Sequence, residues 1–307
     1  FIRDYGIMAL CSKGEDTMDK ENLKAFCRGL GLTEVGIAPG RLPVPDPLPE
    51  VCPLAAGKGL ERYDLARLLP GCRAAVVVLF PYFLAPVEES NLSLYCKLTD
   101  YHKVVPLYLE KIAGWLQAQA PASQQMAIVD TSPLAERDLA VQSGVGFLGD
   151  NGCLINDTYG SWCFVGAVLT TLPLVPDTPR HRECLHCGAC SRNCPGDCFQ
   201  SGQYEYRRCK SYLTQKKGEL TAEETAIIQK TPLVFGCDEC QKCCPYNARA
   251  KETPLPEFHQ DRIPRLEKEK LETMTNRQFR EAYGDRSFAW RGKRILLRNL
   301  ALAAGEK

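Results

Sequence analysis

A chain of 307 residues has room for one large domain or two modest ones, and its hydrophobic fraction of 45% is normal for a globular core. The formal net charge is +1, so no overall excess of charge points to nucleic acid or a membrane, and any basic surface must be local. The 17 cysteines would suit a small secreted disulfide scaffold, but we find no apolar signal sequence and no stretch of roughly 18 apolar residues that could span a membrane. We therefore expect a cytoplasmic protein with reduced thiols.

The first part of the chain alternates between helical and extended patterns, after an expected extension at residues 1–17. Helices are predicted at 19–30, 61–69, 104–119 and in a segment that opens at Pro133. Strands are predicted at 34–38, 74–80, 126–129 and 161–171. The run AAVVVLF at 74–80 is apolar throughout, which is typical of a strand covered on both faces. These elements predict one α/β domain over residues 18–177.

Asp130 directly follows the apolar strand at 126–129. A lone acid at the end of a strand lies where open α/β sheets place their ligands. Partial burial would raise its pKa and suit it to proton donation. The alternative is that Asp130 caps the helix that Pro133 opens, with Thr131 and Ser132 as competitors for that position.

Two further motifs in this domain are weak. The stretch DYH at 100–102 invites comparison with the Asp-x-His-x-x-Gly motif by which many corrinoid proteins ligate cobalt, but Val105 occupies the glycine position. A partly exposed histidine at a helix start is therefore the preferred interpretation of His102. The stretch GVGFLG at 144–149 has the letters of a dinucleotide fingerprint, but it follows a helix rather than a strand, which indicates a turn.

The segment at 178–250 carries two cysteine runs with iron–sulfur spacing. The runs are CLHCGACSRNCP at 184–195 and CDECQKCCP at 237–245. In a ferredoxin-type run, three cysteines bind one [4Fe–4S] cluster and the fourth, followed by proline, binds the other. This rule predicts one cluster on Cys184, Cys187, Cys190 and Cys244. A pair of zinc knuckles is the alternative, but the two Cys-Pro endings favour clusters.

The second cluster then has three predicted ligands, Cys194, Cys237 and Cys240, and one open position. Cys243 has the right local spacing, but it adjoins Cys244, and two neighbouring side chains rarely serve two clusters without strain. Cys209 lies in the connecting segment and could fold back. The spacing favours Cys209 and leaves Cys243 as the alternative.

A local basic feature spans residues 204–217, in the stretch YEYRRCKSYLTQKK. Basic side chains with interleaved aromatic rings fit single-stranded nucleic acid, where phosphates are neutralised and bases are stacked. A solvated helix face is the alternative, and composition alone favours it. A tail at 251–307 follows the cysteine-rich segment, with helices predicted near 276–282 and 291–304.

Taken in order, these motifs resemble those of the epoxyqueuosine reductases, the iron–sulfur and cobalamin enzymes of queuosine-tRNA synthesis. The resemblance is carried by IVDTSPLAERDLAVQSGVGFLGDNGCLI, CLHCGACSRNCP, RRCKSYLTQKKG, FGCDECQKCCPYN and TNRQFREAYGDRSFAWRGKRILLRNLALA. Ferredoxin runs occur in many families, whereas the segments around Asp130 and Cys209 and the tail motif are specific.

The fold class that this resemblance implies is α+β. It places a nitroreductase-like α/β sheet flanked by helices, which binds cobalamin, at 18–177. A ferredoxin-like domain with two [4Fe–4S] clusters follows at 178–250, and a short helical tail at 251–307. The cobalamin is expected to be base-off, without a histidine ligand from the protein.

The resemblance also implies roles for individual residues. Asp130 is implied as the proton donor above the cobalt. The implied corrinoid pocket includes Arg62, Cys96, Ser211 and Asp238. The implied cluster ligands are Cys184, Cys187, Cys190 and Cys244 for one cluster and Cys194, Cys209, Cys237 and Cys240 for the other, which decides for Cys209 over Cys243.

The implied substrate is the epoxide of epoxyqueuosine at the wobble position of a tRNA anticodon, which becomes an alkene and water with two electrons and two protons. We expect an external low-potential electron donor, a monomer, and RNA phosphate contacts at Lys216 and Lys217. A reductive dehalogenase-like enzyme for a small molecule is the alternative. The chain departs from the family in two respects: Asp150 stands where relatives commonly have lysine, and many relatives continue into helical repeats.

Overall fold

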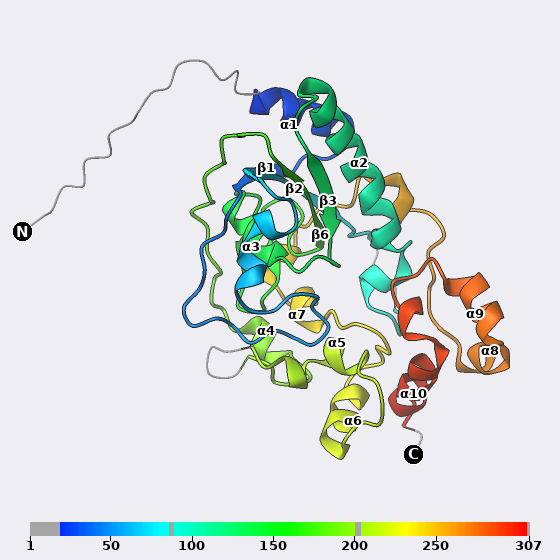
Figure 1. The fold of residues 1–307 in the computed structure, drawn as a ribbon. Coiled ribbons are helices and arrows are strands. Elements are labelled where there is room, and N and C mark those ends of the chain that lie inside the picture. Colours follow the sequence, from blue (N-terminus) through cyan, green and yellow to red (C-terminus); the bar gives the residue numbers. More distant parts are fainter. Residues whose placement is uncertain (1–18, 86–88, 200–203, 306–307) are drawn as a thin grey trace, which may run out of the picture.

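The computed structural model describes residues 19–85, 89–199 and 204–305, so the extension predicted at 1–17 lies outside the described residues. The first part of the chain contains a sheet and its covering helices (Figure 1). Its helices are α1 (Lys20–Gly29), α2 (Tyr101–Gln119) and α3 (Glu136–Gln142), with 3-10 turns η1 (Gly59–Tyr63), η2 (Leu65–Arg67) and η3 (Leu94–Lys97). Its strands are β1 (Val35–Pro39), β2 (Ala74–Pro81), β3 (Gln125–Val129), β4 (Phe147–Leu148), β5 (Leu154–Ile155) and β6 (Cys163–Thr170).

The main sheet has the order β1-β2-β6-β3, and every neighbouring pair in it is antiparallel. This confirms the four predicted strands. The rule for open α/β sheets that pointed to Asp130 applies to parallel strands, whereas the strands here alternate in direction. Gly166 of β6 pairs with Val129 of β3, and a Cβ at Gly166 would lie 2.8 Å from the side chain of Val105 in α2. The glycine therefore lets α2 pack closely on the sheet beside Asp130.

Strand β2 is buried along its whole length because helices cover both faces of the sheet. Val76, Val78 and Phe80 face the core that α1 and α2 complete. Val77 and Leu79 face the opposite core, which α3 completes. Each such buried side chain stabilises the fold by roughly 1.5–3 kcal/mol.

Two predicted helices differ in the structure. The helix predicted at 61–69 is broken into η1 and η2, because Asp64 adopts an extended backbone conformation and caps η2 by accepting from the backbone N–H of Ala66. The helix expected to open at Pro133 begins instead at Glu136, so residues 130–135 form a loop.

The cysteine-rich segment contains short helices joined by loops: α4 (Ala189–Arg192), η5 (Tyr206–Arg208), α5 (Lys210–Leu213), α6 (Ala222–Gln229), α7 (Glu239–Lys242) and η6 (Pro245–Asn247). The sequence analysis did not predict α6, although Thr221 and Glu224 form a capping box at its start. Because few residues of this segment lie in long elements, bound groups can determine the course of its loops.

The tail continues with η7 (Pro256–Phe258), α8 (Lys268–Thr273), α9 (Asn276–Tyr283), η8 (Ala289–Arg291) and α10 (Lys293–Ala303), which confirms the two predicted helices and adds α8. The tail packs against the rest of the molecule, since Phe288 and Leu296 share a core with Leu92 and Phe235. The Asn299 amide of α10 donates to backbone carbonyls at Thr214 and Val234. Among the described residues, we find no helix of a length and apolarity that would cross a membrane.

Candidate active site

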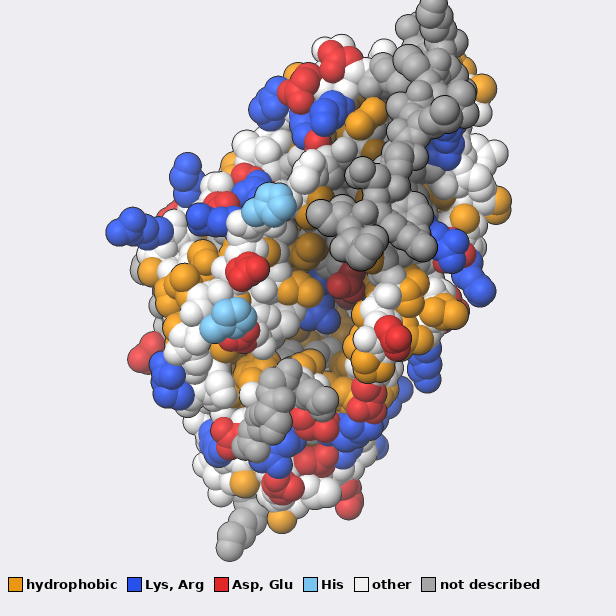
Figure 2. Space-filling view, turned by 90° about the vertical axis from the view of Figure 1, so that its left-hand side faces the viewer, with side chains coloured by type: hydrophobic (Ala, Val, Ile, Leu, Met, Phe, Trp, Pro, Cys, Tyr) orange, Lys and Arg blue, Asp and Glu red, His pale blue; other side chains and the backbone are white. Residues whose placement is uncertain are grey.

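A cavity of about 990 Å³ lies where the sheet, the cysteine-rich segment and the tail meet. The space-filling view shows the molecule hollowed on one face, with hydrophobic side chains along the walls (Figure 2). The sheet side contributes Tyr101, His102, Asp130 and Phe164 to the cavity lining. The cysteine-rich segment contributes Cys209, Ser211, Cys237, Asp238 and Cys240, and the tail contributes Ser287 and Trp290.

Asp130 lies on the cavity wall and uses one carboxylate oxygen for two contacts. The Tyr101 hydroxyl donates to Oδ2 at 2.6 Å, and Nε2 of His102 lies 3.2 Å from the same atom. Asp100 caps α2 by accepting from the backbone N–H of His102, and its Oδ1 also lies 2.8 Å from Nδ1 of the imidazole. A continuous set of hydrogen bonds therefore runs from Asp100 through His102 to Asp130.

These contacts fix the protonation states of the group. Desolvation alone would raise the pKa of Asp130, but hydrogen bonds from His102 and Tyr101 outweigh it and hold the pKa below its ordinary value. Desolvation alone would lower the pKa of His102, but Asp100 and Asp130 raise it to about 9. Near neutral pH Asp130 is therefore ionised and His102 carries the proton.

The expectation of a raised pKa at Asp130 is wrong in its net direction, because the hydrogen bonds from His102 and Tyr101 outweigh the effect of burial. The side chain is 59% exposed, and the cationic His102 beside it stabilises the ionised form. The helix-capping alternative also fails, because the N-cap of α3 is Ala135 and no side chain caps that end. His102 is a partly exposed residue at the start of α2, as predicted, and it is also a partner of Asp130. The sequence analysis missed the pair because 28 residues separate the two side chains and no local pattern joins them.

Two of the four residues carried over for the corrinoid pocket, Ser211 and Asp238, line the cavity. The other two, Arg62 and Cys96, are not among the described residues that line it. Cys96 is fully buried, with Sγ 3.0 Å from Oγ of Ser93. The Arg62 guanidinium donates to the backbone carbonyl of Gly57.

Asp238 is a buried carboxylate at the cavity surface. Its Oδ2 accepts from the backbone N–H of Leu94 at 2.6 Å, whereas Oδ1 has no hydrogen-bond partner among the described residues. Burial raises the pKa of Asp238 to about 6, opposed by the Leu94 contact. Ser287 also lines the cavity, and its buried hydroxyl has no partner among the described residues either. The cavity therefore offers hydrogen-bonding atoms that a bound group would satisfy.

The predicted cluster ligands fall into two sets of neighbouring thiols. In one set, Cys244 lies within electrostatic range of Cys184 and Cys187, and Cys190 within range of Cys184. In the other set, Cys209 lies within range of Cys237 and Cys240 and is joined to Cys194 through Cys198. Cys243, the alternative to Cys209, lies with the first set, beside Cys187 and Cys244.

Two thiols that the sequence analysis did not single out also contact these sets. Cys153 contacts Cys240, and Cys198 contacts both Cys194 and Cys209. Neither belongs to a spaced motif, so only the tertiary structure reveals them.

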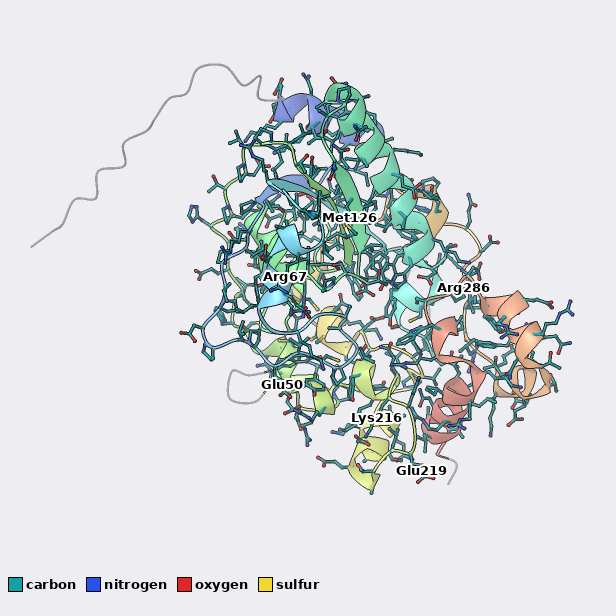
Figure 3. The ribbon with its side chains drawn as sticks, in the orientation of Figure 1. Glu50, Arg67, Met126, Lys216, Glu219 and Arg286 are labelled. Carbon is teal, nitrogen blue, oxygen red and sulfur yellow. The ribbon has the colours of Figure 1, made fainter. Side chains whose placement is uncertain are left out.

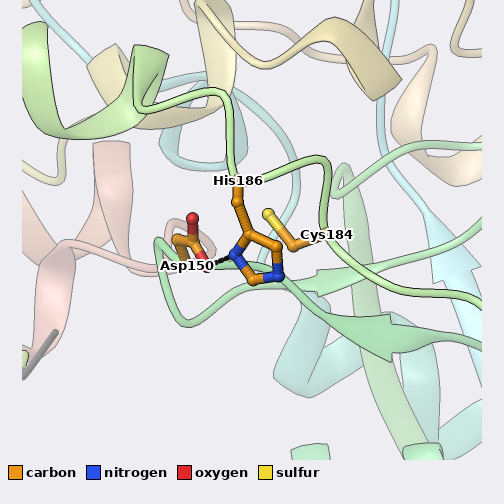
Figure 4. Close-up of side chains that lie close together, drawn as sticks. All are labelled: Asp150, Cys184 and His186. Atoms are coloured by element: carbon orange, nitrogen blue, oxygen red, sulfur yellow. Dashed lines mark hydrogen bonds and ion pairs between the residues drawn. The ribbon is translucent and has the colours of Figure 1, made fainter.

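Asp150 faces the first cysteine run (Figure 4). Its Oδ1 lies 2.8 Å from Nδ1 of His186, and the ligand atoms of Asp150, His186 and Cys184 lie within 4.8 Å of one another. The histidine supplies a donor for the carboxylate. Because Cys184 is a predicted cluster ligand, we treat these residues as the surroundings of that cluster rather than as a separate metal site.

The basic segment at 204–217 is largely neutralised by acidic residues. Its ion pairs with other elements are Arg207 with Glu50, Arg208 with Glu223, and Lys216 with Glu224 at 2.6 Å. Glu50 and Lys216 are labelled in Figure 3. Lys210 is buried and donates to the backbone carbonyl of Ile228. Lys217 is exposed and has no ion pair within the described part of the chain. Of the two predicted RNA contacts, Lys217 is therefore the more available.

Comparison with known proteins shows which family this chain is similar to. A family model described as epoxyqueuosine reductase QueG, DUF1730, matches residues 62–131, and a model described as a 4Fe-4S double cluster binding domain matches residues 183–247. The epoxyqueuosine reductase of Bacillus cereus is 32% identical over 311 residues, which cover 93% of this chain and 81% of the relative. That of Gloeobacter violaceus is 34% identical over 243 residues, which cover 75% of this chain and 76% of the relative.

The solved structures also show similarity to an epoxyqueuosine reductase. The epoxyqueuosine reductase of Streptococcus thermophilus has a TM-score of 0.81 at 26% identity, covering 92% of this chain and 80% of that chain. These matches favour the reductase prediction over the dehalogenase-like alternative. This chain is an oxidoreductase, and it belongs to the epoxyqueuosine reductase family.

Proposed function

We propose that this protein reduces the epoxide of epoxyqueuosine in a tRNA anticodon loop to the alkene, with release of water. The observation that carries the proposal is that the Asp100–His102–Asp130 set opens onto the same cavity as Cys209, Cys237 and Cys240. A proton source and a predicted electron route thus meet at one cavity. An epoxyqueuosine reductase has been solved with an epoxyqueuosine-modified tRNA stem loop, which supports the same substrate here.

The cavity fits a cobalamin. Its volume of about 990 Å³ lies at the upper end of ligand pockets, and the unpartnered Oδ1 of Asp238 and hydroxyl of Ser287 offer polar contacts for the amide groups of a corrin ring. Both ring nitrogens of His102 are already engaged by Asp100 and Asp130, so this histidine would not serve as a ligand to cobalt. Bound in this cavity, cobalamin would supply low-potential reducing chemistry toward the epoxide, with electrons from the clusters.

The two sets of thiols fit the two clusters. Cysteine thiolates are the ordinary ligands of [4Fe–4S] clusters, four to each cluster. We assign Cys184, Cys187, Cys190 and Cys244 to one cluster and Cys194, Cys209, Cys237 and Cys240 to the other. The position of Cys243 among the first set supports Cys209 as the remaining ligand of the second. Thiols of the second set line the cavity, so the second cluster is the inner one. Reduced thiols and clusters suit the cytoplasm.

The protein's own residues supply the protons. His102 holds a proton at neutral pH, and Asp130 Oδ2, which shares it, is exposed to the cavity. In this proposal the proton passes from His102 through Asp130 to the epoxide oxygen as the C–O bond breaks, and Asp100 holds the imidazole in orientation. The reaction needs two electrons and two protons, so a second proton must reach the set from solvent before water leaves.

The mouth of the cavity suits a splayed RNA base. Trp290 lines the cavity yet is 61% exposed, and the guanidinium of Arg291 lies 3.7 Å from the centre of its indole ring. An exposed aromatic ring beside a cation is a platform on which a base can stack while a phosphate is neutralised. We therefore place Trp290 and Arg291 at the RNA interface, with Lys217 as a further phosphate contact.

The test of this proposal is anaerobic turnover with cobalamin, a chemical reductant and an anticodon stem loop that carries epoxyqueuosine. The nucleoside released from the product should be lighter by one oxygen, and the conversion should require both cobalamin and reductant. If protein with both clusters and bound corrinoid leaves the nucleoside unchanged, the proposed substrate is wrong.

A further inference from the structure

The loop that carries Asp130 is held in an unfavourable backbone conformation. Asp130 has φ of +51°, in the left-handed region that residues with a Cβ seldom adopt. Such a residue persists only when its surroundings compensate for the strain, which is of order 1–3 kcal/mol. The side-chain contacts of Asp130 with Tyr101 and His102 provide part of this compensation.

A second set of contacts holds the loop from the opposite side. Oε2 of Glu136 accepts from the backbone N–H of Asp130 at 3.0 Å, and Oε1 accepts from the hydroxyl of Ser132 at 3.0 Å. The same hydroxyl accepts from the backbone N–H of Leu134 at 3.3 Å. One carboxylate thus binds the loop on both sides of Thr131.

Glu136 is itself well anchored. It is the first residue of α3, which packs on the sheet through Leu139 and Ala140, both fully buried. The backbone N–H of Ala135, just before it, donates to the carbonyl of Arg62 in η1. The carboxylate is therefore a fixed point against which the loop is positioned.

We propose that Glu136 is a positioning residue that holds the Asp130 loop against the cavity, so that the Asp130 carboxylate stays on His102. The inference rests on the proposed role of Asp130. Without both hydrogen bonds to Glu136, nothing in α3 opposes the relaxation of Asp130 out of the left-handed conformation, and Oδ2 leaves Tyr101 and His102. A Bacillus subtilis epoxyqueuosine reductase has been seen with its catalytic aspartate loop swung out of the active site, so movement of such a loop has precedent in a relative.

The contacts of Glu136 with the loop can form whether its carboxyl is ionised or protonated. Burial, together with the negative charge of Asp130, raises the pKa of Glu136 to about 7. The titratable or charged groups that face it from neighbouring elements are Asp130 in the loop, Arg62 in η1 and Tyr101 in α2. A protonated carboxyl keeps a carbonyl oxygen that accepts from the Asp130 N–H and gains an O–H that can donate to Ser132.

The test compares Glu136→Ala and Glu136→Gln with Asp138→Asn as the matched control. Asp138 is another carboxylate of α3, and no hydrogen bond joins it to the loop among the described residues. Glutamine keeps an acceptor for the Asp130 N–H and an amide that can donate to Ser132, and it does not titrate. Alanine keeps neither contact.

The principal readout is the pKa of His102, measured by NMR on histidine-labelled protein with both clusters and no substrate, and assigned with His102→Gln. Because Asp130 helps to raise this pKa to about 9, release of the loop should lower it markedly. We expect that fall in Glu136→Ala, and wild-type values in Glu136→Gln and Asp138→Asn. Hydrogen exchange of a peptide covering 129–135 should quicken in Glu136→Ala alone.

An unchanged His102 pKa in Glu136→Ala, or an equal fall in Asp138→Asn, would overturn the proposal. Both measurements are made without cobalamin and without RNA, so they decide the role of Glu136 even if the proposed substrate is wrong. Where turnover is measurable, kcat should fall in Glu136→Ala while KM for the stem loop stays near the wild-type value.

Discussion

Single residues at the cavity depend on neighbours that are distant in the chain. Asp130 is ionised because His102 and Tyr101 stabilise its charged form, and the proton is held by His102. The sequence identifies Asp130 as a candidate by its place after a strand. It does not identify Asp100 or Tyr101 as partners, since α2 approaches the loop only in the folded molecule. Nor does it identify Glu136, whose side chain folds back on the loop from the start of α3.

Asp130→Asn should abolish proton transfer while leaving the fold intact. The amide preserves the size of the side chain but cannot pass a proton, so we expect turnover to fall by about 10²–10⁴-fold. Iron content and melting temperature should match the wild type within error. Wild-type turnover of epoxyqueuosine by this variant would exclude Asp130 from acid catalysis.

His102 should make stability depend on pH. Its pKa of about 9 in the folded protein exceeds the value of about 6.5 expected when unfolded, so its stabilisation is complete below about pH 6.5 and is lost as pH rises through about 9. The melting temperature of the cluster-loaded protein should therefore fall between pH 7 and pH 9.5. His102→Gln should melt lower at pH 7 and should be nearly independent of pH over this interval. Parallel pH profiles for the two proteins would contradict the ion pair.

At the scale of elements, folding pairs most of the positive charges of the basic segment with acidic side chains. Its composition suggests a phosphate-binding stretch, but Arg207, Arg208 and Lys216 are paired with acids from other elements. Only tertiary contacts decide which positive charges remain available, because Glu50 lies in a distant loop. The exposed ring of Trp290, which composition could not distinguish from a core residue, is the stronger RNA candidate.

Trp290→Ala and Lys217→Ala should weaken stem-loop binding in different ways. Loss of a stacked ring costs about 1–3 kcal/mol per base and leaves the salt dependence unchanged. Loss of a phosphate contact should reduce the slope of log K against log salt by about 1. Binding titrations over a salt series separate the two effects, with Lys216→Ala as the control, since Lys216 is paired with Glu224. Wild-type binding by Trp290→Ala at every salt concentration would remove the tail from the interface.

At the scale of the whole molecule, the cavity exists only because three parts of the chain pack together. The tail contacts the cysteine-rich segment through Asn299, and Phe288 packs on Phe235 in that segment. The ligands proposed for the inner cluster come from two runs and from α5's N-cap at Cys209. The clusters should therefore stabilise the packing of distant segments as well as carry electrons.

Cys209→Ala should lose the inner cluster, whereas Cys243→Ala should keep both. Iron and acid-labile sulfide should fall to about half in the first variant and remain unchanged in the second, because four thiolates are needed for each cluster. Spectra of the reduced protein should show one cluster signal missing only in Cys209→Ala. Half-loading of Cys243→Ala, with Cys209→Ala intact, would reverse the assignment.

The sequence by itself determined the features that local patterns encode. Cysteine spacing indicated two clusters because short gaps let one loop bring several thiolates to one cluster while the cysteine before proline reaches the other. The apolar run at 74–80 indicated a doubly covered strand. Tertiary structure alone decided the antiparallel order of the sheet, the charge state of Asp130 and the hold of Glu136 on its loop. The physical reason is that pKa values and loop conformations depend on partners brought together by packing, and no interval in the chain encodes those distances.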